Sequence, residues 1–184
     1  MGEGMMMRQL IKYGVFSLLV LGVASVSHAA TSLPDKVPFL RETYQDWQLA
    51  CQAPGGTNKS GEVKCVATQR AIDVHTHKSV MSLRLEPDGE QVRGVVTVSF
   101  GLDLLHGLTL TNASQPVGDI YSFSTCLPTG CLVPLTFDDG QWRTLLKDNI
   151  GTFTALSFSG QPVKLLFSTR GLEQAMRRAR DLTQ

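Results

Sequence analysis

The residues with the most chemistry open to them are four cysteines that fall into two close pairs. Thirteen residues separate Cys51 from Cys65, and Leu-Pro-Thr-Gly separates Cys126 from Cys131. Such pairs form disulfides, or one of them serves as a redox-active dithiol. Thiol–disulfide enzymes favour two intervening residues and a nearby base, and the shorter pair has neither. We therefore interpret both pairs as structural disulfides.

The connectivity of these cysteines stays open, because four cysteines permit three pairings. Pairing between neighbours fits best. Cys51 and Cys65 lie near the ends of consecutive predicted strands, and the residues between them are rich in Gly, Pro and Asn. A bridge there staples a hairpin and stabilises the fold by roughly 3 kcal/mol on the chain-entropy model. Between Cys126 and Cys131, proline and glycine supply the tight reversal that a short bridge needs.

His75 and His77 suggest metal binding, because one residue separates them and a strand would place both on one face. A catalytic zinc site needs a third ligand, and only His106 or a distant carboxylate is available. We therefore expect a polar strand end that leads into Lys78. We predict no metal ligands and no cofactor.

No catalytic constellation is recognisable in the sequence. No serine lies in a nucleophile-elbow pattern, and no glycine-rich phosphate loop is present. Asp138 and Asp139 directly precede Gly140, so we interpret this carboxylate pair as a β-turn. Trp47 alternates with apolar neighbours, and we expect it in the core rather than against a sugar or cofactor. We predict that the protein is not an enzyme.

Residues 1–29 have the pattern of a secretory signal peptide. Arg8 and Lys12 flank the start of an apolar run over residues 13–26, and small residues lead to a cleavage site after about Ala29. This run is too short for a membrane span, and no second apolar run is long enough. Outside the cytoplasm an even number of cysteines is kept as disulfides. We predict a periplasmic or envelope-surface protein with no transmembrane span.

The remaining chain divides into a flexible leader, 30–43, and a single domain, 44–184. Loss of the signal peptide leaves equal numbers of basic and acidic side chains. A net charge near zero gives no general attraction to nucleic acid. The basic cluster at 177–180 is more simply explained as cations in the last turn of a helix. We predict no nucleic-acid partner.

Short runs of alternating apolar and polar residues dominate this domain. They predict about nine strands, which include 47–51, 62–72, 81–85, 96–100, 108–110, 120–126, 133–137, 153–158 and 163–167. Helical spacing predicts one or two turns over Gln141–Lys147 and an amphipathic helix over Gly171–Leu182. The expected fold is all-β, an antiparallel sandwich or barrel-like domain with a C-terminal α-helix.

A set of residues with this order and spacing resembles a known family. The set is Tyr44, Asp46, Trp47, Cys51, Cys65, Gln69, Phe100–Asp103, Gly107–Leu110, Cys126, Gly130, Cys131, Ser168, Gly171 and Ala175. It is similar to the invasion-associated locus B family of exported bacterial proteins, over nearly the whole mature chain. The resemblance implies an exported all-β protein with two disulfides, linked in some members to host-cell entry. It brings no catalytic residues. The chain departs from the family pattern at the pair Ser99-Phe100 and at Leu172.

Our leading hypothesis for function is a non-enzymatic envelope protein that binds another protein, in the envelope or on a host surface. Loops on a rigid β scaffold usually carry recognition. Leu104, Leu105 and Leu127 are the candidate binding residues, because they lie beside glycines in predicted loops. The equal alternative is that these leucines belong to the core.

Two other functions stay open. One is a small accessory subunit of a periplasmic membrane-bound quinoprotein–cytochrome dehydrogenase, in which the partner would provide any peripheral membrane association. The other is a hydrolase or metalloenzyme that uses His75 and His77.

Overall fold

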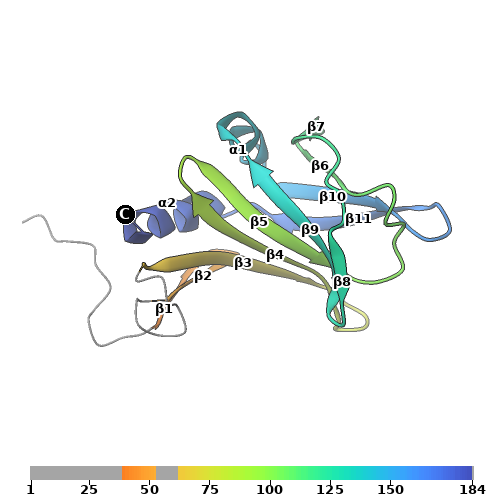
Figure 1. The fold of residues 1–184 in the computed structure, drawn as a ribbon, viewed down its shortest axis with the longest axis horizontal. Helices are drawn as coiled ribbons and strands as arrows, with labels where there is room; N and C mark the ends of the chain where they lie inside the picture. Colours follow the sequence, from red (N-terminus) through yellow and green to blue (C-terminus); the bar gives the residue numbers. More distant parts are fainter. Residues whose placement is uncertain (1–38, 53–61, 184) are drawn as a thin grey trace, which may run out of the picture. The chain divides into compact units, whose positions relative to one another are not determined.

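The computed structural model describes residues 39–52 and 62–183 of the chain. These residues contain eleven strands and two helices (Figure 1). These residues belong to one compact unit, Thr31–Gln184. The strands are β1 (Phe39–Tyr44), β2 (Trp47–Gln52), β3 (Lys64–Ile72), β4 (Ser79–Asp88), β5 (Gln91–Val98), β6 (Thr109–Asn112), β7 (Gln115–Pro116), β8 (Thr125–Leu127), β9 (Gly130–Phe137), β10 (Ile150–Leu156) and β11 (Pro162–Ser168). The helices are α1 (Asp139–Leu145) and α2 (Leu172–Thr183).

The strands form two antiparallel sheets. The larger has the order β1-β2-β3-β4-β5-β9-β8, and the smaller has the order β11-β10-β6-β7. Consecutive strands pair along most of the larger sheet, so it is built largely from hairpins. The predicted antiparallel all-β fold with a C-terminal helix is confirmed. It takes the two-sheet form, since no pairing closes either sheet into a barrel among the described strands.

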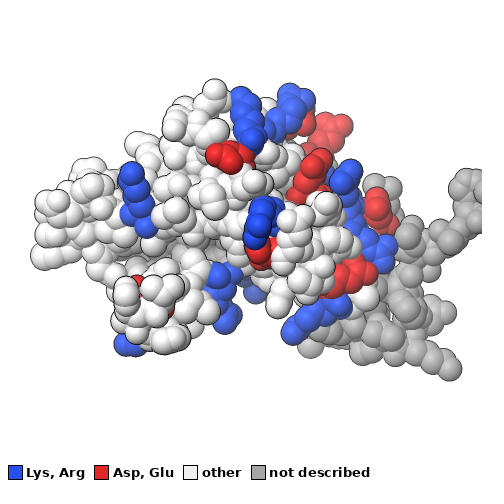
Figure 2. Space-filling model, turned by 180° about the vertical axis from the view of Figure 1, so that it is seen from behind, with Lys and Arg blue, Asp and Glu red and all other residues white. Residues whose placement is uncertain are grey.

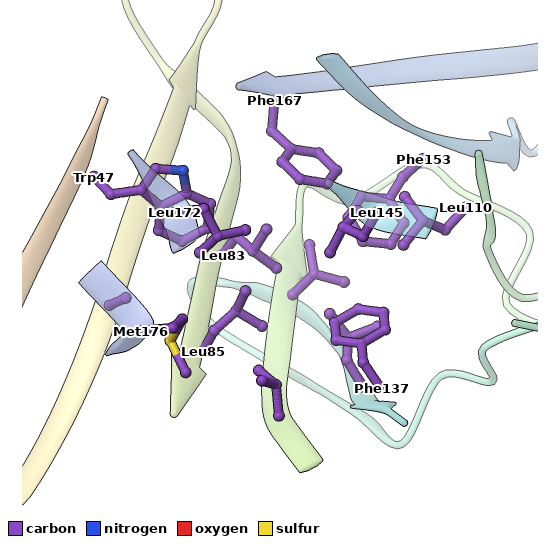
Figure 3. Packing of buried hydrophobic residues seen from close by; sticks show 14 of the residues in the cluster. Trp47, Leu83, Leu85, Leu110, Phe137, Leu145, Phe153, Phe167, Leu172 and Met176 are labelled. Atoms are coloured by element: carbon purple, nitrogen blue, oxygen red, sulfur yellow. The ribbon is translucent and has the colours of Figure 1, made fainter. Parts of the chain in front are cut away.

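Alternate residues of the larger sheet face a core that other elements cover. Leu172 and Met176 of α2 pack beside Trp47 and Leu83 on one half of the sheet (Figure 3). On the other half, side chains from the smaller sheet and α1 gather beside Phe137 (Figure 3). Trp47 is fully buried, as its alternation with apolar neighbours predicts. Neither helix in the described part of the chain is long and apolar enough to cross a bilayer.

The interpretation of Asp138 and Asp139 as a β-turn is wrong. Asp138 is the N-cap of α1: its side chain accepts from the Gln141 N–H at 2.8 Å, and the Gln141 side chain accepts from the Asp138 N–H at 3.0 Å. This capping box satisfies two helix-end donors at once and so favours the helix over an isolated turn.

The predicted flexible leader is wrong in its last residues. They form β1, which pairs with β2 from Phe39–Gln52 to Tyr44–Trp47. Leu40 packs against the core, so this segment gains both a ladder and apolar burial. The rest of the predicted leader (30–38), the signal peptide (1–29) and most residues between the first two cysteines (53–61) lie outside the described residues.

The strand predicted over Ile120–Cys126 forms only in part. Tyr121 makes an isolated bridge with Leu108, and the ladder of β8 starts later, at Thr125. The Tyr121 hydroxyl donates to the Val117 carbonyl at 2.9 Å, and its ring packs edge-on to Phe137 at 6.1 Å. Tyr121 and Phe123 therefore pack against the core as single side chains, Ile120 stays exposed, and the segment does not form a continuous strand.

Candidate partner-binding surface

Both predicted cysteine pairings between neighbours are confirmed. Cys51–Cys65 joins β2 to β3, and Cys126–Cys131 joins β8 to β9. In each case the two cysteines are directly opposite in the antiparallel ladder. Each bridge thus staples one hairpin, which excludes crossed pairing. All four cysteines of the chain are used.

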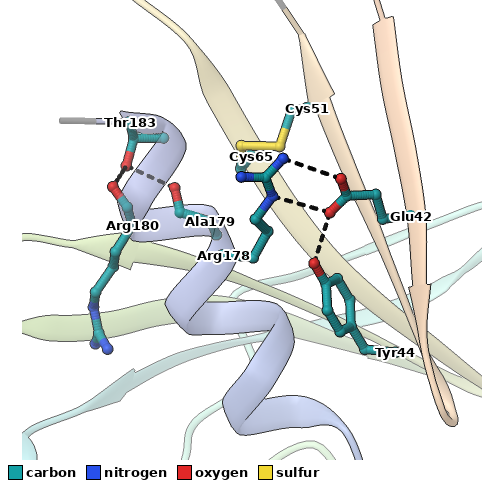
Figure 4. Close-up of a disulfide and its surroundings, with 8 residues drawn as sticks. All are labelled: Glu42, Tyr44, Cys51, Cys65, Arg178, Ala179, Arg180 and Thr183. Carbon is teal, nitrogen blue, oxygen red and sulfur yellow. Dashed lines mark hydrogen bonds and ion pairs between the residues drawn. A yellow bond between two sulfur atoms is a disulfide. The ribbon is translucent and has the colours of Figure 1, made fainter. Parts of the chain in front are cut away.

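The surroundings of the first disulfide anchor the C-terminal helix to the first strand (Figure 4). Arg178 of α2 donates to both carboxylate oxygens of Glu42 at 3.2 Å, and the Tyr44 hydroxyl donates to Glu42 at 2.7 Å. The Arg178 hydrogen bond is the main cause that lowers the pKa of Glu42, and burial is the main cause that raises the pKa of Tyr44 to about 12. This pair explains why a charged segment such as β1 is held in the fold.

The histidines considered for zinc do not lie on a strand. His75 and His77 are exposed in the turn between β3 and β4, where Asp73 accepts hydrogen bonds from the backbone N–H groups of His75 (3.1 Å) and Thr76 (2.7 Å). Their predicted place at a strand end is therefore wrong, because this cap folds the segment into a turn. Within residues 39–52 and 62–183 no group of three His, Cys, Asp or Glu residues is placed to hold a metal ion.

Most polar members of the family-like residue set meet at one place, where β11 touches β2 and β3. The Gln69 side chain accepts from the Ser168 N–H at 2.8 Å and donates to the Ser168 carbonyl at 3.0 Å. That carbonyl also accepts from Trp47 Nε1 at 2.8 Å, and Ser168 Oγ donates to Asp46 at 2.6 Å. We call Asp46, Trp47, Gln69, Ser168 and Gly171 the seam, because they fasten the smaller sheet to the larger.

Gly171 completes the seam through its backbone. Its φ is +83°, a conformation that favours glycine, and a Cβ there would collide with the Tyr44 carbonyl oxygen. Glycine at this position lets the chain turn from β11 into α2 against the end of β1. The residues that carry the family resemblance here therefore have structural roles.

A different surface lies at the end of the β10–β11 hairpin. Phe158 is 90% exposed and Leu105 is 96% exposed. Phe100, Leu104 and Ile120 are also exposed, with fractions from 45% to 63%. We call these five residues the apolar loop end. Soluble surfaces seldom gather so many large apolar side chains, and such patches mark interaction sites.

The five residues come from three segments: the loop after β5, the residues around Ile120 and the β10–β11 turn. Hydrogen bonds and close contacts join these segments. The Phe158 N–H donates to the Gly101 carbonyl, and the Asp103 N–H donates to the Leu156 carbonyl, both at 2.9 Å. A Cβ on Gly107 would lie 2.7 Å from Ile120 Cγ2, so Ile120 contacts the same loop. The five apolar side chains thus project from one hydrogen-bonded unit.

Asp103 fixes the shape of the most exposed loop. One carboxylate oxygen accepts from the Leu105 N–H at 2.9 Å, and the other lies 2.8 Å from His106 Nδ1. The Leu105 hydrogen bond, followed by that of His106, lowers the pKa of Asp103. Leu104 and Leu105 are therefore displayed in a defined turn, which reduces the entropy lost on binding.

Charge is sparse around the apolar loop end. Asp103 is the one Asp, Glu, Lys or Arg in residues 99–108, residues 157–163 have none, and Asp119 precedes Ile120. In Figure 2 the lobe at the left edge, which corresponds to the end of the β10–β11 hairpin at the right of Figure 1, is almost entirely white. A partner for this surface must therefore offer apolar surface.

The sequence found part of this surface. Leu104 and Leu105 are exposed, which excludes the alternative that they belong to the core. Leu127, 46% exposed, lies on the separate β8–β9 hairpin, which touches the end of β5 through Gly130 and Val98. The sequence missed Phe158, which was assigned to a strand. Its flanking residues Ser157, Ser159 and Gly160 were the available signal for a turn.

Comparison with known proteins gives consistent relatives. A family model described as "Invasion associated locus B (IalB) protein" matches residues 47–180. An invasion protein B homologue of Brucella abortus (strain 2308) is 37% identical over 164 residues, which cover 88% of this chain and 91% of that protein. Invasion protein B of Bartonella bacilliformis is 29% identical over 117 residues, 62% of this chain and 59% of that protein.

A solved structure shares the fold. The crystal structure of invasion associated protein B from Bartonella henselae superimposes with a TM-score of 0.69 at 22% sequence identity. The match covers 76% of this chain and 94% of that one.

Proposed function

Because the chain belongs to the invasion-associated locus B family, we propose that it is an exported envelope protein that binds a protein partner through the apolar loop end and has no catalytic role. Its relatives are named invasion proteins, which supports a role at the boundary between the bacterium and a host. The signal-peptide pattern over 1–29 and the two disulfides support a place in the periplasm or on the envelope surface.

One observation carries the binding role: large apolar side chains project from a hydrogen-bonded loop unit on a disulfide-stapled scaffold. Aromatic and large aliphatic anchors that fill pockets on a partner supply most of the energy of protein interfaces. Phe158 and Leu105 have the exposure that such anchors need before binding. A preformed loop also loses little entropy on docking.

Site-specific photo-crosslinking in living cells tests the binding role. A benzophenone amino acid replaces Leu105 in the full chain, and the same residue replaces Gln174, which is exposed on α2, as the control. We expect position 105 to crosslink to one protein. Position 174 should not crosslink to that protein. Phe158→Asp should abolish the crosslink, because the two side chains belong to one surface.

Two results would contradict the proposal. One is the absence of any protein crosslinked from position 105. The other is an unchanged crosslink in the Phe158→Asp protein. The captured protein also decides between the two hypotheses for its class, since a dehydrogenase or cytochrome subunit would identify the chain as an accessory subunit.

Export is tested separately. We expect envelope fractions to contain a protein that begins near Ala30 and has no free thiol when denatured without reductant. Recovery of a chain that retains Met1, or full labelling by a thiol reagent, would contradict export.

A further inference from the structure

β11 lies at the border of the smaller sheet, and among the described strands it pairs with β10 alone. The direction of its backbone groups follows from its neighbours. Asn112 Nδ2 donates to the Ile150 carbonyl, which places that group on the β6 side of β10. The next residue, Gly151, faces β11 opposite Phe167. Phe167 therefore directs its backbone toward β10, and Ser168 directs its backbone away.

The contacts of Ser168 agree with this direction, because its N–H and carbonyl meet Gln69 and Trp47 instead of β10. Alternation then directs the N–H and carbonyl groups of Leu166 and Lys164 to the same open side. No hydrogen bond from these groups to another part of residues 39–52 or 62–183 is present. Pro162 has no N–H, so the free edge extends from Lys164 to Leu166.

A groove of about 410 Å³ runs along this edge. Ile150, Leu166 and Ser168 form one side of it, and Gln69, Arg70 and Ala71 of β3 form part of the other. Leu166 is 55% exposed and Ile150 is 45% exposed. The groove thus offers backbone donors and acceptors beside apolar side chains, which is how sheet edges accept an added strand.

The groove is lined by one cation without a carboxylate partner, Arg70, and Lys164 lies beside it on the free edge, two residues before Leu166. Asp46, the one acidic residue of the groove, is paired with Arg170 at 2.9 Å. Arg70 on β3 and Lys164 on β11 are exposed, and neither has a carboxylate partner within the described residues. A ligand that forms ion pairs with these two cations carries carboxylates.

We propose that the β11 edge binds an extended, acidic peptide segment of a protein partner, which adds to the smaller sheet as a fifth strand beside Leu166 and Lys164. This inference rests on the proposed role in protein binding, and it names a second contact region and its chemistry. The added strand hydrogen-bonds to the backbone of β11, while its acidic side chains reach Arg70 and Lys164.

Selection from a library of random nine-residue peptides, with the oxidised full-length mature protein as target, tests the inference. We expect the enriched peptides to be rich in Asp and Glu. Leu166→Pro should weaken their binding by about tenfold, because it removes an outward N–H and leaves the β10 ladder intact. Leu166→Ala, which keeps that N–H, should weaken binding less. Hydrogen exchange of the Leu166 amide should slow when peptide is bound.

A second variant avoids dependence on the proline. Arg70→Glu should also weaken binding by about tenfold, whereas Arg177→Glu on α2, an equal change of charge at an exposed site, should alter binding by less than about twofold. Binding retained by both Leu166→Pro and Arg70→Glu overturns the inference. So does a library that yields no peptides or basic ones, or a homodimer that Leu166→Pro dissociates, since the edge is then filled by a second copy.

This experiment separates the edge from the apolar loop end. Leu105→Asp and Phe158→Asp should bind the enriched peptides as the unchanged protein does. If position 105 gives no protein crosslink but the protein binds the enriched peptides, only the proposed binding role of the apolar loop end is contradicted. If position 105 gives the crosslink but the protein binds no acidic peptides, only the inference about the β11 edge is contradicted.

Discussion

The seam and the apolar loop end use their residues in opposite ways. At the seam, polar side chains from β2, β3 and β11 converge, and each of them is hydrogen-bonded. At the apolar loop end, Leu105 and Phe158 face solvent with no partner among the described residues to bury them. The first region gains its stability from contacts within the chain. The second is held in place by its backbone and leaves its side chains for something else.

The glycine–leucine segment shows the same division within ten residues. Leu108 and Leu110 are buried, and Leu102 packs against the core. Leu104 and Leu105, which lie between the two halves of the family-like pattern, are exposed. Apart from Phe100, where this chain departs from the family pattern, the residues that carry the resemblance thus shape the loop, and Leu104 and Leu105 outside it are exposed. A family pattern can therefore identify this fold and leave its partner undetermined.

The largest expected effect is at the seam. Trp47→Ala removes a fully buried indole and its hydrogen bond to the Ser168 carbonyl. We expect the free energy of unfolding to fall by about 4 kcal/mol. Guanidinium unfolding followed by circular dichroism measures this loss. An unchanged unfolding midpoint would show that the two sheets do not depend on the seam.

A smaller loss separates hydrogen bonding from apolar burial. Gln69→Leu keeps the volume of the side chain but removes its bonds to Ser168 and to the Asp46 carbonyl. We expect a loss of about 2 kcal/mol, because the half-buried Ser168 N–H is left without an acceptor. Gln48→Leu, on the neighbouring exposed position, is the matched control and should change stability by less than about 0.5 kcal/mol. Equal effects of the two variants would contradict the role of the seam.

Acid should weaken the seam. The Ser168 hydroxyl, followed by Arg170, lowers the pKa of Asp46 below its ordinary value of 3.8. The carboxylate therefore stabilises the fold fully above that value, and this contribution is lost as the pH falls through the folded-state pKa. We expect Asp46→Asn to be less stable than the unchanged protein at pH 7, and this difference should shrink as the pH falls below the ordinary value of 3.8. A constant difference across this range, measured by urea unfolding, would argue against the assignment.

Local patterns predicted most of the fold because half-buried strands repeat with a period of two. They failed where distant contacts decide. Arg41 and Glu42 make β1 look like a solvated leader, yet Glu42 pairs with Arg178, 136 positions away. Gln69 and Ser168 are 99 positions apart, so no local pattern could pair them. By contrast, the capping box of Asp138 and Gln141 was present in the sequence and was missed.

The candidate surface was only half predictable for a related reason. Leucines beside glycines in a loop are unusual enough to be noticed, as Leu104 and Leu105 were. Phe158 continues the apolar run of β10, so its position past the end of the strand at Leu156 is hidden. The contact between Phe158 and Gly101 joins loops far apart in the chain. Only the folded structure reveals that the segments that carry these exposed side chains are hydrogen-bonded to each other.

The most direct test measures stability and binding together in two variants. The free energy of unfolding of the double variant Leu105→Asp/Phe158→Asp should lie within about 0.5 kcal/mol of that of the unchanged protein, because both side chains are already in solvent. With the benzophenone placed at Leu104, its partner crosslink should disappear. Gln69→Leu should lose about 2 kcal/mol and keep that crosslink wherever it remains folded. If the double variant loses much more than about 0.5 kcal/mol of unfolding free energy, or keeps its crosslink, it is wrong that the seam stabilises the fold and the apolar loop end binds the partner.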